Sequence, residues 1–450
     1  MTAPAGFYFL LILNYIMEGN IIYLISGILF IIGYIYIALE HKTHINKSGV
    51  ALVLGGLLWV VMAIVSHDKH EISLALAENA GEIFSIVIFL LSAMTIVELL
   101  VHYQFFDWIQ EQIMKKKISQ AKLFWLLGIL TFVMSAFLDN LTTTLIMIQI
   151  GRKIYKDKDN FLIFVANTVI AANAGGAASP IGDVTTIMLW LANKFNALQV
   201  MSIGIIPALV AWVIPQYLMG KKIKKHEIAE QANPKMDFVD EEKVKPYWAV
   251  IIIGMFSFLL PVVFNLIGLP PFLGLLLGVG ILWVFIDIKA KGNHEHHNNG
   301  KIVNIIQKTD ITTLKFFIGI LLAVGALAHS GLLKHLNNFI FGAEINAIRL
   351  IIGNTVLGFT SSILDNVPLV AAAIKMFASG VPASLWVLLA ITAGTGGSML
   401  VIGSAAGVAA MGQVKELNFS YYLKKATIPA LLGYIFAVAT WVGMYYLGIF

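Results

Sequence analysis

The feature that most constrains this chain is a short polar sequence inside a long apolar stretch. The sequence SAFLDN, residues 135–140, lies where no basic residue occurs between Lys122 and Arg152. Ionisable groups are costly at membrane depth, and those found there usually have a function. The pattern S-x-x-L-D-N returns as SSILDN at residues 361–366, 226 positions later. Two copies of so unusual a pattern indicate an internal repeat.

Composition limits the class of protein. Hydrophobic residues make up 59% of the 450 positions and charged residues 12%, with a mean hydropathy of +0.85. Such a chain is too apolar for a soluble protein, and we expect it to cross a lipid bilayer, here the inner cell membrane, many times. It has no cysteine, which excludes disulfides, thiolate metal sites and a cysteine nucleophile. The pI of about 9.0 reflects lysines in short loops between spans, not nucleic-acid binding.

The first half of the chain predicts a re-entrant hairpin and a broken helix. The apolar arms on either side of SAFLDN, within residues 121–151, are too short for two full crossings, which need about 20 residues each. Residues 161–192 are interrupted by glycines and by Pro180, which predicts a helix in two pieces. A hydrophobic N-terminal segment, residues 1–20, holds the short run Phe7–Ile16, which could be a short or tilted first helix or a signal-like segment; a retained helix is favoured. The remaining apolar windows predict spans near 21–39, 49–66, 83–101 and 199–219.

The second half repeats this order. A hairpin is predicted at 347–378 and a broken helix at 384–411. Each half then has five crossings, and because five is odd the second half enters the membrane from the opposite side. The predicted fold is an all-α polytopic membrane protein of two inverted repeats, residues 21–219 and 247–450, joined by a cytoplasmic linker at 220–246. The spans expected in the second repeat lie near 247–268, 271–289, 313–333 and 428–449.

Loop charges give an independent orientation. If the linker is cytoplasmic, alternation places all but five of the 30 Lys and Arg residues on the cytoplasmic side. Such a bias is typical of loops that stay inside. The first hairpin is then expected to open from the cytoplasm and the second from the opposite side. The five exceptions are Lys69, Lys194, Lys334, Arg349 and Lys375.

The pairs Asp139-Asn140 and Asp365-Asn366 are the main candidates for a binding site. Asp and Asn cap helices well, so each pair could simply satisfy a helix end at a hairpin tip. Alternatively, carboxylate, amide and hydroxyl oxygens together form a site for a hard cation, because such cations prefer oxygen ligands. The duplication at matching positions, each beside a broken helix, favours the second interpretation.

Asp183 follows the first break and is a candidate for a group that binds both a cation and a proton. It could also be the N-cap of a half-helix at Val184–Leu191, and the two roles are compatible. Ser404 takes its place in the second break, so the first half is expected to carry the coupling chemistry. Glu98, one helical turn before His102, is a supporting candidate or an interfacial residue. The other polar residues that could coordinate a cation or satisfy the broken backbone are Ser135, Thr142, Thr143, Asn173, Ser179, Thr186, Ser361 and Ser404.

Three further patterns lie outside the candidate site. The tract His294–His297 is either a solvated loop or a site for metal binding or pH sensing. The stretches Ile302–Ile306 and Phe419–Leu423 are amphipathic and are expected to lie along the inner membrane interface. Three glycines predict close helix packing, within the chain or at a dimer interface: Gly274, Gly278 and Gly280.

Four motifs, in order along nearly the whole chain, carry a family resemblance. They are SAFLDNLTTT at 135–144, NAGGAASPIGDVTT at 173–186, SSILDNVP at 361–368 and TGGSMLVIGS at 395–404. In these motifs the chain closely resembles the NhaD-type sodium/proton antiporters of the ion transporter superfamily. The resemblance implies exchange of Na⁺ or Li⁺ for H⁺, without a cofactor, and related folds suggest a homodimer.

The resemblance also implies roles for residues. Asp139, Asn140 and Asp183 become the expected Na⁺ ligands, with Asp365 and Asn366 completing the cation and proton site. Related divalent-anion/sodium symporters have Ser-Asn-Thr at their hairpin tips, where this chain has an aspartate in place of the serine. An added carboxylate fits a site where a proton and a cation compete.

Other functions remain to be compared with this one. Transport of arsenite or of a carboxylate on the same fold would call for Arg or Lys near the breaks, and none is there. An intramembrane aspartyl protease also uses paired aspartates, but its G-x-G-D sequence is absent, since Pro-Ile-Gly precedes Asp183. A passive channel is harder to exclude, although inverted repeats with two hairpins suit alternating access. The sequence therefore predicts a transporter, not an enzyme.

Overall fold

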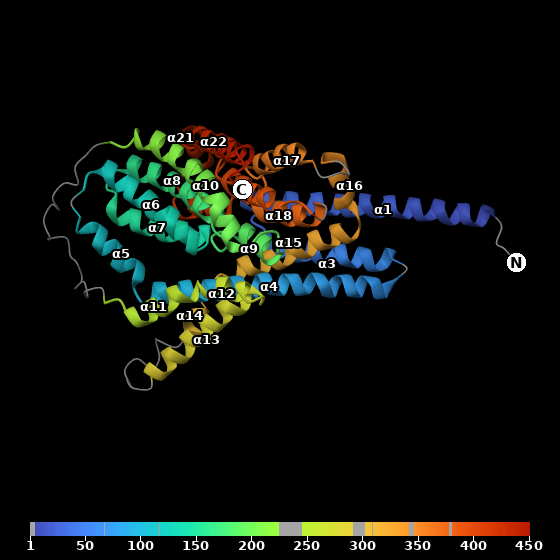
Figure 1. Cartoon of the computed structure of the whole chain (residues 1–450), viewed down its shortest axis with the longest axis horizontal. Helices are drawn as coiled ribbons and strands as arrows, with labels where there is room; N and C mark the ends of the chain where they lie inside the picture. The colour runs from blue at the N-terminus through green and yellow to red at the C-terminus, as the bar shows by residue number, and fades with distance from the viewer. Residues whose placement is uncertain are drawn as a thin grey trace. The chain divides into compact units, whose positions relative to one another are not determined.

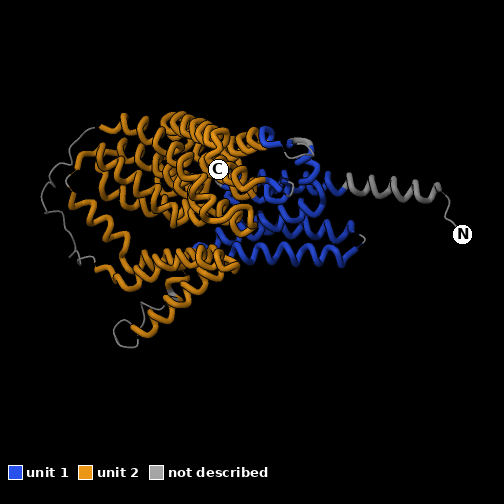
Figure 2. Tube along the Cα trace, in the orientation of Figure 1, with its two compact units in different colours: residues 1–87, 310–349, 371–381 blue, residues 88–309, 350–370, 382–450 orange. Residues whose placement is uncertain are grey.

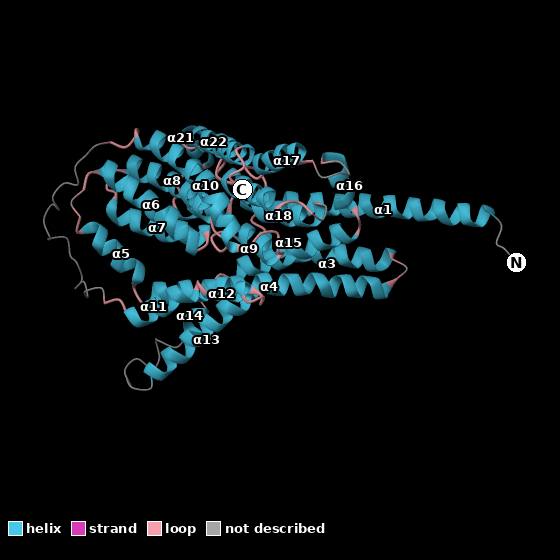
Figure 3. Ribbon diagram, in the orientation of Figure 1, coloured by secondary structure: helices cyan, strands magenta, loops and turns pink. Residues whose placement is uncertain are grey.

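The computed structural model of this chain describes residues 5–66, 68–116, 118–224, 245–290, 302–307, 309–341, 346–377 and 380–450. In these residues the secondary structure is helical throughout, without a strand (Figure 3). Nine of the described helices are long and apolar enough to cross a membrane. The all-helical, multi-span prediction is therefore confirmed. Most of the predicted linker and the whole His294–His297 tract lie outside the described residues.

The helices of the first half follow the predicted order closely (Figure 1). Capping side chains mark their beginnings: Asp139, Asp157, Asp183 and Asn196 each accept a hydrogen bond from a backbone N–H of the following turn. The elements are α1 (Ala5–Ala38), α2 (Glu40–Thr43), α3 (Lys47–Val65), α4 (Lys69–His102), α5 (Phe105–Met114), α6 (Gln120–Phe137), α7 (Asn140–Ile154), α8 (Lys158–Ala177), α9 (Val184–Leu191) and α10 (Ala197–Gly220).

The second half has the same succession of long, paired and divided helices. Its elements are α11 (Trp248–Ser257), α12 (Leu260–Leu266), α13 (Pro271–Ala290), α14 (Ile302–Ile306), α15 (Ile311–His329), α16 (Leu332–Ile340), α17 (Ala347–Thr360), α18 (Asn366–Met376), α19 (Ala383–Gly396), α20 (Ala405–Gln413), α21 (Phe419–Lys425) and α22 (Thr427–Tyr446).

The structure differs from the predicted boundaries at several places. α1 is one helix that covers both the short run Phe7–Ile16 and the span expected at 21–39. α4 begins at Lys69 instead of near residue 83, because polar residues do not end a helix that has no breaker. The span expected at 247–268 is divided into α11 and α12, with Pro261 in the first turn of α12.

Two of the three predicted packing glycines are used within the chain. A Cβ at Gly274 would lie 2.6 Å from the Leu260 carbonyl carbon, and one at Gly278 would lie 2.6 Å from Cβ of Ser257. Both positions therefore allow α13 to pack closely on α11 and α12. Gly280 has no neighbour within 4 Å of such a Cβ.

The chain divides into two compact units, shown in different colours in Figure 2. Unit 1 comprises residues 1–87, 310–349 and 371–381, and in it α3 packs along α15. The two helices come close at small residues, since a Cβ at Gly55 would lie 2.6 Å from the Gly319 carbonyl oxygen. Trp59 Nε1 also donates to the Leu322 carbonyl oxygen at 3.0 Å.

Unit 2 comprises residues 88–309, 350–370 and 382–450 and contains both S-x-x-L-D-N motifs and both helix breaks. Its core is formed by α8 and α19, which are buried along nearly their whole lengths. α8 packs against α6, α7, α10 and α19, and α10 packs against α22. A helix that is buried on all sides needs small and apolar residues on every face, as both helices have.

Buried Gln216 holds three of these helices together. Its Nε2 donates to the Phe124 carbonyl oxygen of α6 at 3.0 Å, and its Oε1 accepts from Asn167 Nδ2 of α8 at 2.5 Å. Trp212 Nε1, one turn earlier on α10, donates to the same Oε1 at 3.0 Å. This network fixes α6 and α8 against α10.

Candidate functional site

The short connection between α6 and α7 is shaped by Asp139. Its Oδ1 accepts a hydrogen bond from the Thr142 backbone N–H at 2.8 Å, and its Oδ2 accepts one from the Thr142 hydroxyl at 2.6 Å. Asp139 is thus the N-cap of α7 and is half-buried. The next residue, Asn140, is buried and points its amide away from this cap, toward the break between α8 and α9.

Asp183 lies at the centre of the buried polar cluster in unit 2. It caps α9 through Oδ1, which accepts from the Thr185 backbone N–H at 3.0 Å, and through a reciprocal bond with Thr186. Its Oδ2 accepts from Asn140 Nδ2 at 3.0 Å and from Asn366 Nδ2 at 3.2 Å. Only 1% of Asp183 is exposed. One carboxylate oxygen therefore receives an amide from each of the two predicted hairpin tips.

Asn173 joins the two breaks. Its Oδ1 accepts from Asn140 Nδ2 at 2.9 Å. Its Nδ2 donates to the hydroxyl oxygens of Ser398 at 2.8 Å and Ser404 at 2.9 Å. Ser404 is the N-cap of α20 and takes the place that Asp183 has before α9, as the sequence predicted. Ser398 was not singled out, although it lies in the TGGS part of a motif that was.

The electrostatics of the cluster are those of a buried anion without a fixed cation. The hydrogen-bonded side chains around Asp183 and Asn173 are amides and hydroxyls, and none is Lys or Arg. A buried carboxylate is strongly unfavourable unless a cation or a proton neutralises it. The site is therefore suited to bind one or the other.

Two serines form matching hydrogen bonds to α8 and α19, the helices that precede the two breaks. Ser135 Oγ donates to the Ala172 carbonyl oxygen at 2.6 Å, and Ser361 Oγ donates to the Ala393 carbonyl oxygen at 2.8 Å. The serines are 226 positions apart and the carbonyls 221 apart. The same local contact is thus made once in each half of the chain.

The glycines of the breaks match as well. A Cβ at Gly182 would clash with the Ser135 carbonyl oxygen, and one at Gly403 would lie 2.6 Å from that of Ser361. Glycine is needed at both positions because the backbone of the predicted hairpin tip approaches too closely for any side chain. Gly182 and Gly403 are again 221 positions apart.

The remaining predicted residues take varied places. Ser179 accepts from the Ile181 backbone N–H at 3.3 Å within the first break, and Asp365 Oδ1 accepts from the Val367 N–H at 3.1 Å. Thr143 is fully buried, and its hydroxyl has no hydrogen-bond partner among the described residues. Glu98 is half-buried near the end of α4, and its supporting role stays a prediction.

Comparison with known proteins places the chain in a family. Residues 28–394 match the CitMHS family, which is described as citrate transporter. The chain is 38% identical over 424 residues to "Sodium/proton antiporter 1" of Arabidopsis thaliana, an alignment that covers 93% of this chain and 72% of the relative. It is 31% identical over 439 residues to "Na(+)/H(+) antiporter NhaD" of Alkalimonas amylolytica, covering 91% and 88% of the two chains.

A further relative agrees with these. "Na(+)/H(+) antiporter NhaD" of Vibrio parahaemolyticus is 31% identical over 416 residues, covering 86% of this chain and 97% of the relative. The resemblance predicted from the four motifs is therefore confirmed over almost the whole chain. The chain is a multi-pass membrane protein of the CitMHS family and belongs to its NhaD-type sodium/proton antiporters.

Proposed function

We propose that this chain exchanges Na⁺ or Li⁺ for H⁺ across the membrane by alternating access. The observation that carries the proposal is the environment of Asp183, a buried carboxylate that accepts a hydrogen bond from one amide of each half of the chain. The buried Asp183 carboxylate is neutralised by one positive charge, which is either a metal cation or a proton. Competition between the two for the same oxygens couples their movements in opposite directions.

The donor set explains how a cation is held. An Asn side chain presents either its NH₂ group or its carbonyl oxygen when its amide plane rotates. In the structure Asn140 and Asn366 turn their NH₂ groups toward Asp183. With Na⁺ beside Asp183, the two amides turn their oxygens inward, and Asp139 and Asp365 add negative charge nearby. Protonation of Asp183 removes the charge that attracts the cation, and Na⁺ leaves.

The description of the family is citrate transporter, so transport of a carboxylate is the alternative function to test. Citrate carries several negative charges and would need basic side chains in the site. The side chains that contact Asp183 and Asn173 instead offer a carboxylate, amides and hydroxyls. A multiply charged anion beside Asp183 would be repelled, so this donor set favours a cation.

We also propose that residues 21–219 and 247–450 are inverted repeats, each with a re-entrant hairpin and a broken helix. The matched contacts of Ser135 and Ser361, and of Gly182 and Gly403, support this arrangement. Three loops assigned to the cytoplasm also meet at one end of unit 2. Lys224 contacts Asp157 at 3.2 Å, Lys158 contacts Glu416 at 3.0 Å, and Lys222 Nζ donates to the Lys425 carbonyl oxygen at 3.4 Å.

The experiment is a pH-dye assay in proteoliposomes that hold the purified protein. A ΔpH is imposed, and NaCl, LiCl, KCl or choline citrate is added in turn. Na⁺ and Li⁺ are expected to dissipate the gradient, and citrate is not. Uptake of labelled citrate without any Na⁺-dependent proton movement would refute the proposal.

Chemical crosslinking in the same liposomes would test the homodimer, for which the exposed apolar face of α13 around Gly280 provides a surface.

A further inference from the structure

The short helix α21 has the features of a membrane-surface helix. It has Phe419 and Leu423 exposed at 41% and 44%, and it ends in Lys424 and Lys425, both exposed. The span α22 begins two residues later, at Thr427. Lysines that directly precede a span lie at the level of the lipid headgroups, and apolar side chains beside them enter the acyl region. The interfacial location of Phe419–Leu423 stays a prediction.

A third lysine comes from another helix. Lys222, just beyond the end of α10, donates to the Lys425 carbonyl oxygen at 3.4 Å. We name Lys222, Lys424 and Lys425 the lysine cluster. Among the described residues none of the three ammonium groups forms an ion pair, whereas the nearby acids are already paired: Asp157 and Asp159 with Lys224, and Glu416 with Lys158. The cluster therefore presents positive charge that no acidic side chain among the described residues compensates.

The same helix is connected to the ion site by its buried face. Tyr422 is fully buried, and its hydroxyl donates to the Ser398 carbonyl oxygen at 2.7 Å. The Ser398 hydroxyl in turn accepts from Asn173 Nδ2 at 2.8 Å. Asn173 is bound to Asn140, which is bound to Asp183. One hydrogen bond thus links α21 to the break before α20.

We propose that the lysine cluster binds the headgroup of an anionic phospholipid and that this lipid, through Tyr422 and Ser398, adjusts the turnover of the transporter. The occupant is identified by charge, because exposed lysines flanked by Phe419 and Leu423 fit a phosphate headgroup with its acyl chains. A zwitterionic lipid offers the same chains without net negative charge. The effect on turnover rests on the proposed ion exchange, whereas the lipid site does not.

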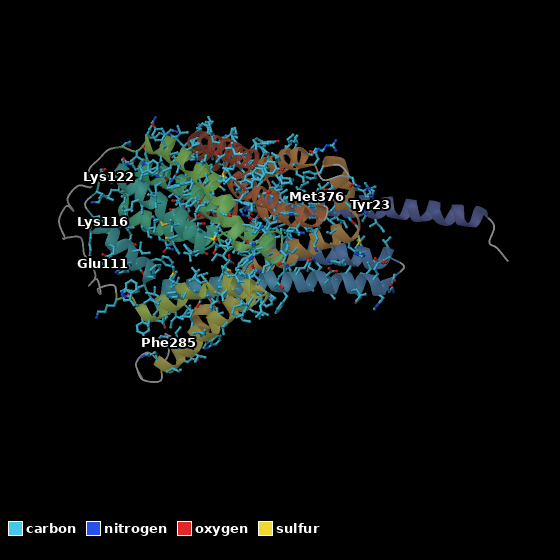
Figure 4. The ribbon with its side chains drawn as sticks, in the orientation of Figure 1. Tyr23, Glu111, Lys116, Lys122, Phe285 and Met376 are labelled. Atoms are coloured by element: carbon cyan, nitrogen blue, oxygen red, sulfur yellow. The ribbon has the colours of Figure 1, made fainter. Side chains whose placement is uncertain are left out.

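The lipid site is tested by native mass spectrometry of the detergent-purified protein with phosphatidylglycerol or phosphatidylcholine. The wild type is expected to retain phosphatidylglycerol in severalfold excess. The triple variant Lys222→Gln, Lys424→Gln, Lys425→Gln is expected to lose that preference. The control removes the same charge at Lys115, Lys116 and Lys122, of which Figure 4 shows Lys116 and Lys122 grouped with Glu111 at one end of unit 2. The lipid site would be overturned if both triple variants lost the preference for phosphatidylglycerol equally, or if both kept it.

The coupling is tested in proteoliposomes of phosphatidylcholine with and without phosphatidylglycerol. The wild type is expected to exchange Na⁺ for H⁺ severalfold faster with phosphatidylglycerol, at an unchanged apparent KM for Na⁺. Tyr422→Phe keeps the ring and is expected to bind the lipid normally but to lose the acceleration. Acceleration equal to that of the wild type in Tyr422→Phe would overturn the coupling. A wild type without exchange in any liposome contradicts the proposed function and with it the coupling, while the mass spectra still decide the lipid site.

Discussion

Asn140 and Asn366, which are 226 positions apart, donate hydrogen bonds to the same atom, Oδ2 of Asp183. The two residues follow the aspartates of the two S-x-x-L-D-N motifs, yet the chain provides only one carboxylate for both. At the matching position in the second half, Ser404 is bound by Asn173 instead. The two matching motifs thus meet at one asymmetric site, and the first half supplies its buried carboxylate.

Replacing Asp183 should abolish exchange. Asp183→Asn keeps the size of the side chain and can still cap α9, but it removes the charge that a cation or a proton must neutralise. We expect Na⁺-dependent proton movement in vesicles to fall to the level of empty vesicles, with normal expression. Asp107→Asn, on the exposed surface of α5, is the matched control and should exchange normally. Normal apparent Na⁺ affinity in Asp183→Asn would remove this residue from the mechanism.

Asp139→Asn should also stop exchange, by a different route. Asp139 caps α7 through its two bonds to Thr142, and the residue after it, Asn140, binds Asp183. An amide keeps part of the cap but removes the negative charge beside the site. The measurement is the same dye assay, with the melting temperature in detergent to show that the fold is kept. Full activity at low Na⁺ concentration would show that Asp139 is only a cap.

Asp365→Asn should be milder than Asp183→Asn. Asp365 accepts from the Val367 backbone N–H, while the amide beside it, on Asn366, binds Asp183. We therefore expect reduced Na⁺ affinity or turnover with measurable exchange remaining. Apparent Na⁺ affinity, measured against pH for both variants, decides this. An inactive Asp365→Asn beside an active Asp183→Asn would show that the coupling site lies in the second half of the chain and not in the first.

The amides Asn140 and Asn366 should contribute comparably and depend on each other. Asn140→Ala and Asn366→Ala each remove one amide oxygen that is proposed to hold the cation, a contact with a charged group worth about 1.5 kcal/mol or more, so the apparent KM for Na⁺ should rise about tenfold in each. Because both act on one oxygen, the double variant should be less impaired than the product of the two effects. Strict additivity in the double-mutant cycle would show that the two amides act at separate sites.

The close backbone approach at the breaks predicts a stability effect. Gly182→Ala and Gly403→Ala would force a methyl group against the Ser135 and Ser361 carbonyl oxygens. Overpacking of this kind costs about 1–3 kcal/mol, so the melting temperature in detergent should fall in both variants. Gly412→Ala, where a Cβ would have no neighbour within 4 Å, is the control and should melt as the wild type does. Unchanged melting of both break variants would contradict the matched contacts.

The inverted topology can be tested with single cysteines, because the chain has no native thiol. Lys224→Cys should react with a membrane-impermeant maleimide only from the cytoplasmic side, and Lys334→Cys only from the opposite side. Both positions are exposed. Right-side-out and inverted vesicles provide the two orientations. Labelling of both cysteines from one side would rule out the inverted repeat.

Local sequence was enough to place most helices and the caps. Apolar windows marked the spans, and glycine and proline marked the two breaks, because hydropathy and backbone freedom are properties of neighbouring residues. Capping was one of the two roles predicted for Asp139 and Asp183, and they do cap α7 and α9. Ser404, predicted only as the counterpart of Asp183, caps α20. The amphipathic α5 was missed, since a surface helix of polar and aromatic residues between two spans has no strong apolar run.

The sequence by itself thus determined that this chain spans a membrane, carries two matching polar motifs and belongs with the sodium/proton antiporters. Only the tertiary structure decided which polar groups meet. Asn366 reaches Asp183 across 183 positions, Asn173 reaches Ser398 across 225, and Gly274 serves packing within the chain. Such contacts depend on how whole helices pack, and the periodicity of one segment does not report the face that a distant segment will cover.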